Sequence, residues 1–228
     1  MSIRLRRLNS TVAIAFFLGG SLFAIGAWVA QVGSGEAVTS ASIYLVGGVF
    51  FSTGGYGSVL QAVNEPAGAA AGRWRWWSYR PMDLVWLAAF VLFCGTLAFA
   101  VSLVFSFMEG LSVRGEDRLI WAPDMIGCIL FLISGRLGMV ALRSEASSWI
   151  QPRNLAWWVA VVNQLGSILF FIAGLAAFTR PAIGSVVNVD VANWGTFGGA
   201  LCFALGGILQ AFERPVEASG SSRSLVGP

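Results

Sequence analysis

The stretch PMDLVW at residues 81–86, followed by GTLAF at 95–99, decides the fold because the chain contains this pattern more than once. It returns as PRNLAW at 152–157 with GSILF at 166–170, and more faintly as LGGSLF at 18–23. The helices that follow end alike, in GSVLQAVNEP at 57–66 and GGILQAFERP at 206–215. A repeat of this kind means that one supersecondary unit is used several times. We predict three repeated helical hairpins, over residues 12–66, 83–145 and 153–215.

The composition places these hairpins in a lipid bilayer. Of the 228 residues, 57% are hydrophobic and only 11% are charged, whereas a soluble domain carries roughly a quarter of charged residues. Six segments are long and apolar enough to cross a membrane as helices, near residues 12–31, 43–63, 83–107, 121–142, 155–178 and 193–212. We therefore predict an all-α polytopic membrane protein with a single membrane domain, residues 1–215, and a disordered cytoplasmic tail, residues 216–228.

The distribution of arginine predicts the orientation. The N-terminal arm, the second and fourth loops and the tail together hold ten arginines, whereas the other three loops hold only Arg114, Arg118 and Arg180. Because cytoplasmic loops carry the excess of basic residues, both termini are predicted to lie in the cytoplasm. The first segment lacks a cleavage site for signal peptidase and is interpreted as an uncleaved span. The alternating stretch RWRWWSYR at 73–80 is interpreted as an anchor for the third helix, or alternatively as a site for anionic lipid headgroups.

Several kinds of chemistry find no support in the sequence. Histidine is absent, which removes the commonest general base and metal ligand. Cys94, Cys128 and Cys202 lie within apolar segments and form no C-x-x-C pair. We predict no catalytic residue, no cofactor and no metal site, and no basic run is long enough to indicate nucleic-acid binding.

Glycine is abundant inside the apolar segments, with 28 residues in the chain and pairs such as Gly19-Gly20 and Gly206-Gly207. Small residues let helix backbones approach closely in lipid, where the hydrophobic effect gives little attraction between helices. These glycines predict close helix contacts, either within the chain or with a second copy or another membrane protein.

Four polar residues in or beside the apolar segments form a candidate intramembrane cluster. Arg136 lies about two turns before the predicted cytoplasmic end of its helix, and Asp83 opens the third helix on the same side. An ion pair between them would offset the energetic penalty of a charge in the membrane. Alternatively, Asp83 stabilises the start of its helix. Asn163 and Gln164 stand where the preceding repeat has Leu92 and Phe93, so they serve function or hydrogen bonding between helices.

The third repeat resembles the YrhK-like domain, a small two-helix bacterial membrane module. The resemblance rests on NQLGSILF at 163–170, which contains its G-S-x-x-F motif, and on GALCFALGGILQ at 199–210 with Pro215, which is similar to its F-x-x-G-S-x-x-L-x-x-x-P motif but has Gly207 in place of the serine. It covers residues 154–215 best and the two earlier repeats less well, since the second has Arg136 in the glycine-serine region and no closing proline. The resemblance implies the architecture and a bacterial inner membrane, and carries over no catalytic residue.

Three functions are compatible with these patterns. The first is a non-enzymatic structural or interaction component of the membrane. The second is a transporter or channel for a small solute or anion, using Arg136, Asn163 and Gln164, since internal repeats are common in transporters. The third is a membrane enzyme using Asp83, Asp124 or Glu145, which no catalytic arrangement in the sequence supports. A dry interior would favour the first function, and a polar cavity open to one side the second.

Overall fold

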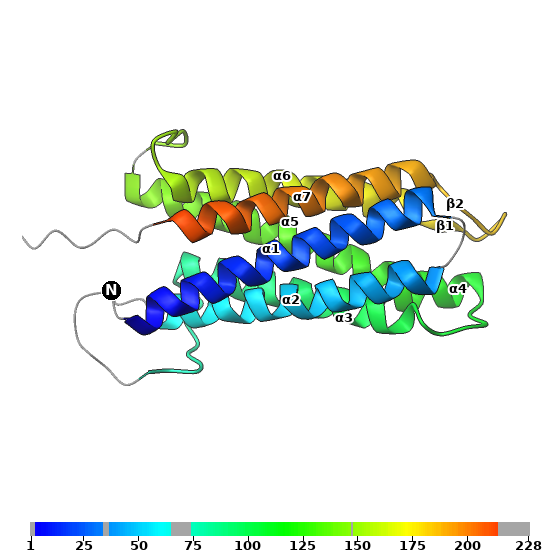
Figure 1. Ribbon diagram of the computed structural model, residues 1–228, viewed down its shortest axis with the longest axis horizontal. Helices are drawn as coiled ribbons and strands as arrows, with labels where there is room; N and C mark the ends of the chain where they lie inside the picture. The colour runs from blue at the N-terminus through cyan, green and yellow to red at the C-terminus, as the bar shows by residue number, and fades with distance from the viewer. Residues whose placement is uncertain (1–2, 34–36, 65–73, 147, 214–228) are drawn as a thin grey trace, which may run out of the picture.

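The computed structural model describes residues 3–33, 37–64, 74–146 and 148–213, so the predicted tail, residues 216–228, lies outside the described residues. The elements are α1 (Ile3–Val32), α2 (Ala37–Asn64), α3 (Leu84–Phe105), α4 (Val113–Glu116), the π-helix η1 (Asp117–Trp121), α5 (Ala122–Ala146), α6 (Leu155–Ala176), β1 (Thr179–Arg180), β2 (Ser185–Val186) and α7 (Val189–Phe212). Six helical segments are long and apolar enough to span a membrane, the fourth being the continuous run α4–η1–α5. The predicted all-α polytopic fold is confirmed (Figure 1).

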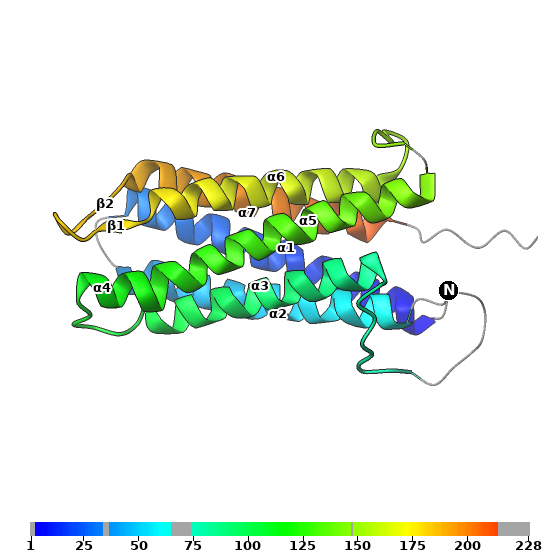
Figure 2. The same cartoon turned by 180° about the vertical axis from the view of Figure 1, so that it is seen from behind.

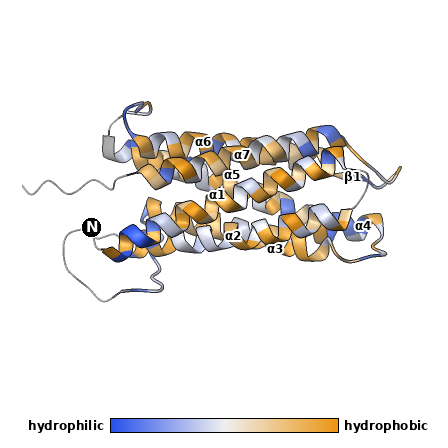
Figure 3. Cartoon of the chain, viewed as in Figure 1, coloured by the Kyte–Doolittle hydropathy of each residue, from blue (hydrophilic) through white to orange (hydrophobic). Residues whose placement is uncertain are grey.

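The six spanning helices form a closed ring. Each packs on the next in the order α1, α2, α3, α5, α6 and α7, and α7 packs back on α1. Figure 2 shows the same bundle from behind, with α4 and the β1–β2 hairpin at one end. We call this the β end, and we call the opposite end, where α1 begins and α7 finishes, the terminal end. Hydrophobic residues run along the length of the helices, as expected for a bundle surrounded by lipid (Figure 3).

The repeated starts of α3 and α6 share one capping mechanism. The Asp83 carboxylate accepts hydrogen bonds from the backbone N–H groups of Val85 and Trp86, at 3.0 and 3.2 Å. At the corresponding position before α6, the Asn154 side chain accepts from the N–H of Ala156 at 3.0 Å. Both residues satisfy N–H groups that a helix start leaves without partners, which is why Asp or Asn is favoured there.

A Gly-x-x-x-Phe pattern occurs in every spanning helix and builds the contacts inside each hairpin. In each hairpin, the glycine of the first helix lies against the phenylalanine ring of the second, and the glycine of the second helix lies against the phenylalanine ring of the first. A Cβ atom added to any of these glycines would lie between 2.7 and 3.1 Å from a ring carbon, so the ring would have to shift to make room for it. The contacts are Gly19–Phe51 and Gly47–Phe23 in the first hairpin, Gly95–Phe131 and Gly127–Phe99 in the second, and Gly166–Phe203 and Gly199–Phe170 in the third.

These phenylalanines meet on the axis of the ring and fill the middle of the bundle. Phe51, Phe131 and Phe203 form one layer, with ring centroids 5.3 to 6.3 Å apart. Phe170 lies between Phe23 and Phe99 in a second layer nearer the β end, at 6.4 and 6.2 Å. Such edge-on and offset ring pairs stabilise beyond their buried area. The centre of the bundle is therefore a packed aromatic core.

Glycine also joins one hairpin to the next. A Cβ added to Gly20 in α1 would lie 2.6 Å from the backbone nitrogen of Ala204 in α7, so the ring closes through direct backbone contact. Gly55 lies against the backbone of Phe93, and Gly207 against that of Phe17. Of the two origins that the sequence leaves open for the glycine contacts, packing within the chain accounts for these positions.

The terminal end is tied together by polar side chains. The Asn9 side-chain oxygen accepts hydrogen bonds from Gln61 at 2.9 Å and from Gln210 at 3.2 Å, which links α1 to α2 and α7. The Asn9 amide in turn donates to the Gln210 carbonyl at 3.1 Å. Arg80 donates to the carbonyls of Ala62 and Val63 at the end of α2. This contact fits the interpretation of residues 74–80 as a helix anchor, while residues 65–73 lie outside the description.

Candidate functional site

The four residues of the predicted polar cluster do not converge. Asp83 caps α3, and the exposed Arg136 guanidinium lies over the Trp149 ring, 4.9 Å from its centroid. Within the described chain, Arg136 and Asp83 form no ion pair. The pairing prediction therefore does not hold, because each group already has another partner.

Asn163 and Gln164 point to different neighbours of α6. The Asn163 side-chain oxygen lies against Gly206 in α7, and the Gln164 side-chain oxygen against Gly135 in α5. Both oxygens are buried and accept no hydrogen bond from the described residues. The two residues therefore occupy two separate helix interfaces, where glycine makes room for a polar side chain.

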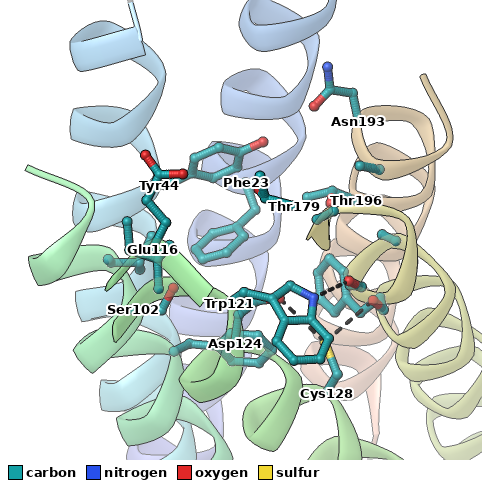
Figure 4. A pocket seen from close by; sticks show the side chains of 18 of the residues that line it. Phe23, Tyr44, Ser102, Glu116, Trp121, Asp124, Cys128, Thr179, Asn193 and Thr196 are labelled. Carbon is teal, nitrogen blue, oxygen red and sulfur yellow. Dashed lines mark hydrogen bonds between the residues drawn. The ribbon is translucent and has the colours of Figure 1, made fainter. Parts of the chain in front are cut away.

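The structure instead contains a cavity of about 310 Å³ at the β end, on the axis of the ring (Figure 4). Its floor is the phenylalanine layer formed by Phe23, Phe99 and Phe170. Its walls come from every spanning helix and from β1. They include Tyr44, Ser102, Glu116, Asp117, Trp121, Asp124, Cys128, Gly174, Thr179, Asn193 and Thr196. None of the predicted cluster residues lines it.

One wall of the cavity carries three carboxyl groups. Glu116 ends α4, Asp117 begins the π-helix η1, and Asp124 lies in the first turn of α5 after Pro123. These elements form one continuous helical stretch. One face of this stretch lines the cavity, through residues 116–117, 120–121, 124 and 128. A π-helix inserts one residue into a helix and is frequent at functional sites. Here the π-helix adjoins the acidic wall.

Short contacts fix the acidic wall to α6. The Trp121 indole N–H donates to the Gly174 carbonyl at 2.8 Å, and the Cys128 thiol donates to the Phe170 carbonyl at 3.3 Å. A Cβ on Gly174 would lie 3.4 Å from a carboxylate oxygen of Asp124 and 2.6 Å from the Met125 sulfur. Glycine at position 174 thus lets the Met125 sulfur approach α6 closely, beside Asp124.

The opposite wall is polar and uncharged. Figure 4 shows Thr179, Asn193 and Thr196 across the cavity from Tyr44 and Glu116. The Asn193 amide donates to Gln31 at 3.0 Å, which connects this wall to α1. Among the residues that the structure describes, no three His, Cys, Asp or Glu side chains are placed to hold a metal ion. The arrangement is suited to enclosing a small molecule that has both an apolar and a polar part.

From the sequence, Asp124 is considered only as a candidate residue of a membrane enzyme, which does not predict a cavity. The signal that was available is the spacing of Asp117 and Asp124, which puts both on one helical face next to Glu116 at a membrane boundary. The contributions of Tyr44, Thr179 and Thr196 come from distant segments and leave no local pattern.

Comparisons of the chain with protein-family models, with curated proteins and with solved structures find no match. The fold and composition by themselves define the class: an all-α integral membrane protein whose six spanning helices contact the lipid bilayer.

Proposed function

We propose that this protein is a non-enzymatic component of a bacterial cytoplasmic membrane that binds a small molecule in the cavity at its β end. The YrhK-like motifs at residues 163–170 and 199–210 support the bacterial setting. The excess of arginine at the terminal end supports cytoplasmic termini and a cavity facing the outside.

The observation that carries this proposal is that packed phenylalanine rings separate the cavity from the terminal end of the bundle. Phe23, Phe99 and Phe170 close the cavity on that side, and the layer of Phe51, Phe131 and Phe203 lies directly beneath. Further toward the terminal end, the Asn9–Gln61–Gln210 hydrogen bonds hold the helices together. A pore needs a continuous polar path, whereas a partly polar cavity with an apolar floor is typical of a binding site.

Transport is the second candidate, favoured by the position of the cavity at one end of the bundle. A carrier exposes its site to one side at a time. In this case the aromatic core would have to part during each cycle. The anion path predicted from Arg136, Asn163 and Gln164 receives no support from the cavity, whose charged lining groups are acidic.

Cysteine accessibility tests the proposal. Thr196→Cys places a thiol on the cavity wall, and Val59→Cys places one in the fully buried interior on the far side of the aromatic core. The test uses purified protein with Cys128→Ala, which removes the native thiol on the cavity wall. In this background a small methanethiosulfonate reagent should modify Thr196→Cys well above the level of the chain without the added thiol, while Val59→Cys stays at that level. In intact cells, an impermeant reagent should reach Thr196→Cys from outside.

Three results would count against the proposal. An unreactive Thr196→Cys in purified protein would mean that the cavity is closed to solution. Equal modification of both variants would mean that a path continues through the bundle and would favour transport. Modification in inverted vesicles but not in intact cells would reverse the orientation.

A further inference from the structure

We infer that the ligand of this cavity is a small organic cation, an ammonium compound with apolar substituents. The inference rests on the proposed function and adds the chemical class of the ligand. Charge, an unpartnered carboxylate oxygen and the aromatic floor support it separately.

The cavity has an excess of negative charge at its lining. Glu116, Asp117 and Asp124 line it, and no arginine does. The arginines at this end, Arg114, Arg118 and Arg180, are all exposed. Arg180 is engaged in its own turn, donating to the Val186 carbonyl at 3.2 Å. Charge attraction strengthens as the surroundings become less polar, so an enclosed acidic cavity selects cations over anions of equal size.

One of the carboxylate oxygens needs a donor. Asp117 Oδ1 is buried and has no hydrogen-bond partner among the described residues, although the residue lines the cavity. A buried acceptor without a donor is destabilising, and native proteins rarely keep one without a reason. An ammonium group in the cavity would offer this oxygen a positive charge or an N–H donor.

The remaining surface suits an ammonium ion better than a metal ion. Phe23, Phe99 and Phe170 form the floor, and Tyr44 and Trp121 add aromatic surface to the walls. Aromatic faces attract quaternary and protonated amines, whereas Ca²⁺ and Mg²⁺ require a shell of six or more oxygens. A volume of about 310 Å³ is at the lower end of ligand pockets, which restricts the ligand to a small amine.

The test compares choline with 3,3-dimethyl-1-butanol, which has the same shape with carbon in place of the ammonium nitrogen. Binding to purified protein is measured by calorimetry and by the rise in thermal stability. We expect choline to bind at least about tenfold more tightly than the alcohol, as is reasonable for a desolvated cation over aromatic faces beside carboxylates. Asp124→Asn should lower the choline affinity by about tenfold, a typical effect of removing one close charge, and leave the alcohol unaffected.

An aspartate outside the cavity at the same end of the bundle provides the control. Asp190 is a first-turn aspartate of α7, as Asp124 is of α5, but it accepts from Gln31 at 2.8 Å and does not line the cavity. Asp190→Asn should leave the choline affinity unchanged. If Asp124→Asn does not fold, the preference of the cavity for cations is tested instead by the reaction rates of charged thiol reagents with Thr196→Cys. A cationic methanethiosulfonate should then react faster than an anionic one, relative to the same ratio at the exposed Ile183→Cys.

The outcomes separate this inference from the proposed function. Equal affinity for choline and the alcohol, or equal relative rates for the two reagents, overturns the cation and leaves a binding cavity. A response of Asp190→Asn as large as that of Asp124→Asn also overturns it, because the effect is then general charge. If neither compound binds, the inference of a cationic ligand is wrong. The proposed binding function is wrong as well only if the thiol of Thr196→Cys stays unreactive.

Discussion

The two ends of the bundle use the same ring of helices but differ in what fills it. At the terminal end, Val12 and Val59 are fully buried. The Asn9 side chain accepts hydrogen bonds from both Gln61 and Gln210, so the interior is closed there. At the β end, small residues such as Gly174 leave a cavity with acidic walls. The Gly-x-x-x-Phe contacts therefore specify the hairpins, while the residues on either side of them decide whether an end of the bundle is solid or hollow.

The largest effect should come from breaking the ring itself, on which both ends depend. Gly20→Val would force a side chain into the backbone of Ala204, and overpacking a close contact costs about 3 kcal/mol or more. We expect loss of the folded monomer in detergent, measured by size-exclusion chromatography and thermal unfolding. Gly138→Val is the control, since no atom lies within 4 Å of a Cβ at that position. Equal losses for both variants would show that the close contact at Gly20 is not the cause.

A smaller effect should separate the two ends. Asn9→Leu removes the acceptor of Gln61 and Gln210 in the closed end, and polar groups left without partners cost about 1–3 kcal/mol of stability. Thr196→Val alters the hollow end, where the side chain lines open space, and should change thermal stability by less than about 0.5 kcal/mol. If Thr196→Val is as destabilising as Asn9→Leu, the β end is as tightly packed as the terminal end.

The smallest effect concerns Arg136 at the terminal side of α5. A double-mutant cycle of Arg136→Leu with Trp149→Leu should give a coupling of about 0.5–1 kcal/mol, the range of an exposed cation–π contact. The cycle of Arg136→Leu with Asp83→Ala should be additive, although Asp83→Ala alone costs about 1 kcal/mol as a lost helix cap. Coupling between Arg136 and Asp83 larger than that with Trp149 would restore the ion pair predicted from the sequence.

Much of the fold could be predicted because it depends on local signals. Spanning segments follow from composition, and Asp83 and Asn154 occupy corresponding caps in repeated stretches. Aligning the second helices of the first and third hairpins on their Leu-Gln-Ala stretches, however, pairs Gly57 with Gly206. The contacts instead pair Gly54 with Gly206, three residues earlier. Gly54 lies against Phe16 and Gly206 against Asn163, and Phe16 and Asn163 stand three residues before Gly19 and Gly166. Helix ends resemble one another for local reasons, whereas register is fixed by contacts across the hairpin.

The candidate site could not be predicted in the same way. Arg136, Asn163 and Gln164 are polar residues in apolar segments, and such residues commonly have a function. The sequence does not show which neighbouring helix each of these side chains faces. Whether they meet depends on the faces that α5 and α6 present to their neighbours, and α6 directs Asn163 to α7 and Gln164 to α5. The cavity arises from segments far apart in sequence, so only the assembled ring brings Tyr44, Asp124 and Thr196 together.

The contact of α7 with α1 means that the ring of hairpins has no necessary beginning. The first and last helices lie side by side, joined near their outer ends by the hydrogen bond from Asn9 to the Gln210 carbonyl. Chains whose termini lie close together commonly tolerate new ends elsewhere. A circular permutant that joins the present termini and opens between α2 and α3 would keep all six interfaces, with synthesis starting at the second hairpin. The order of the hairpins along the gene is thus one of three orders that would place the same helices in contact.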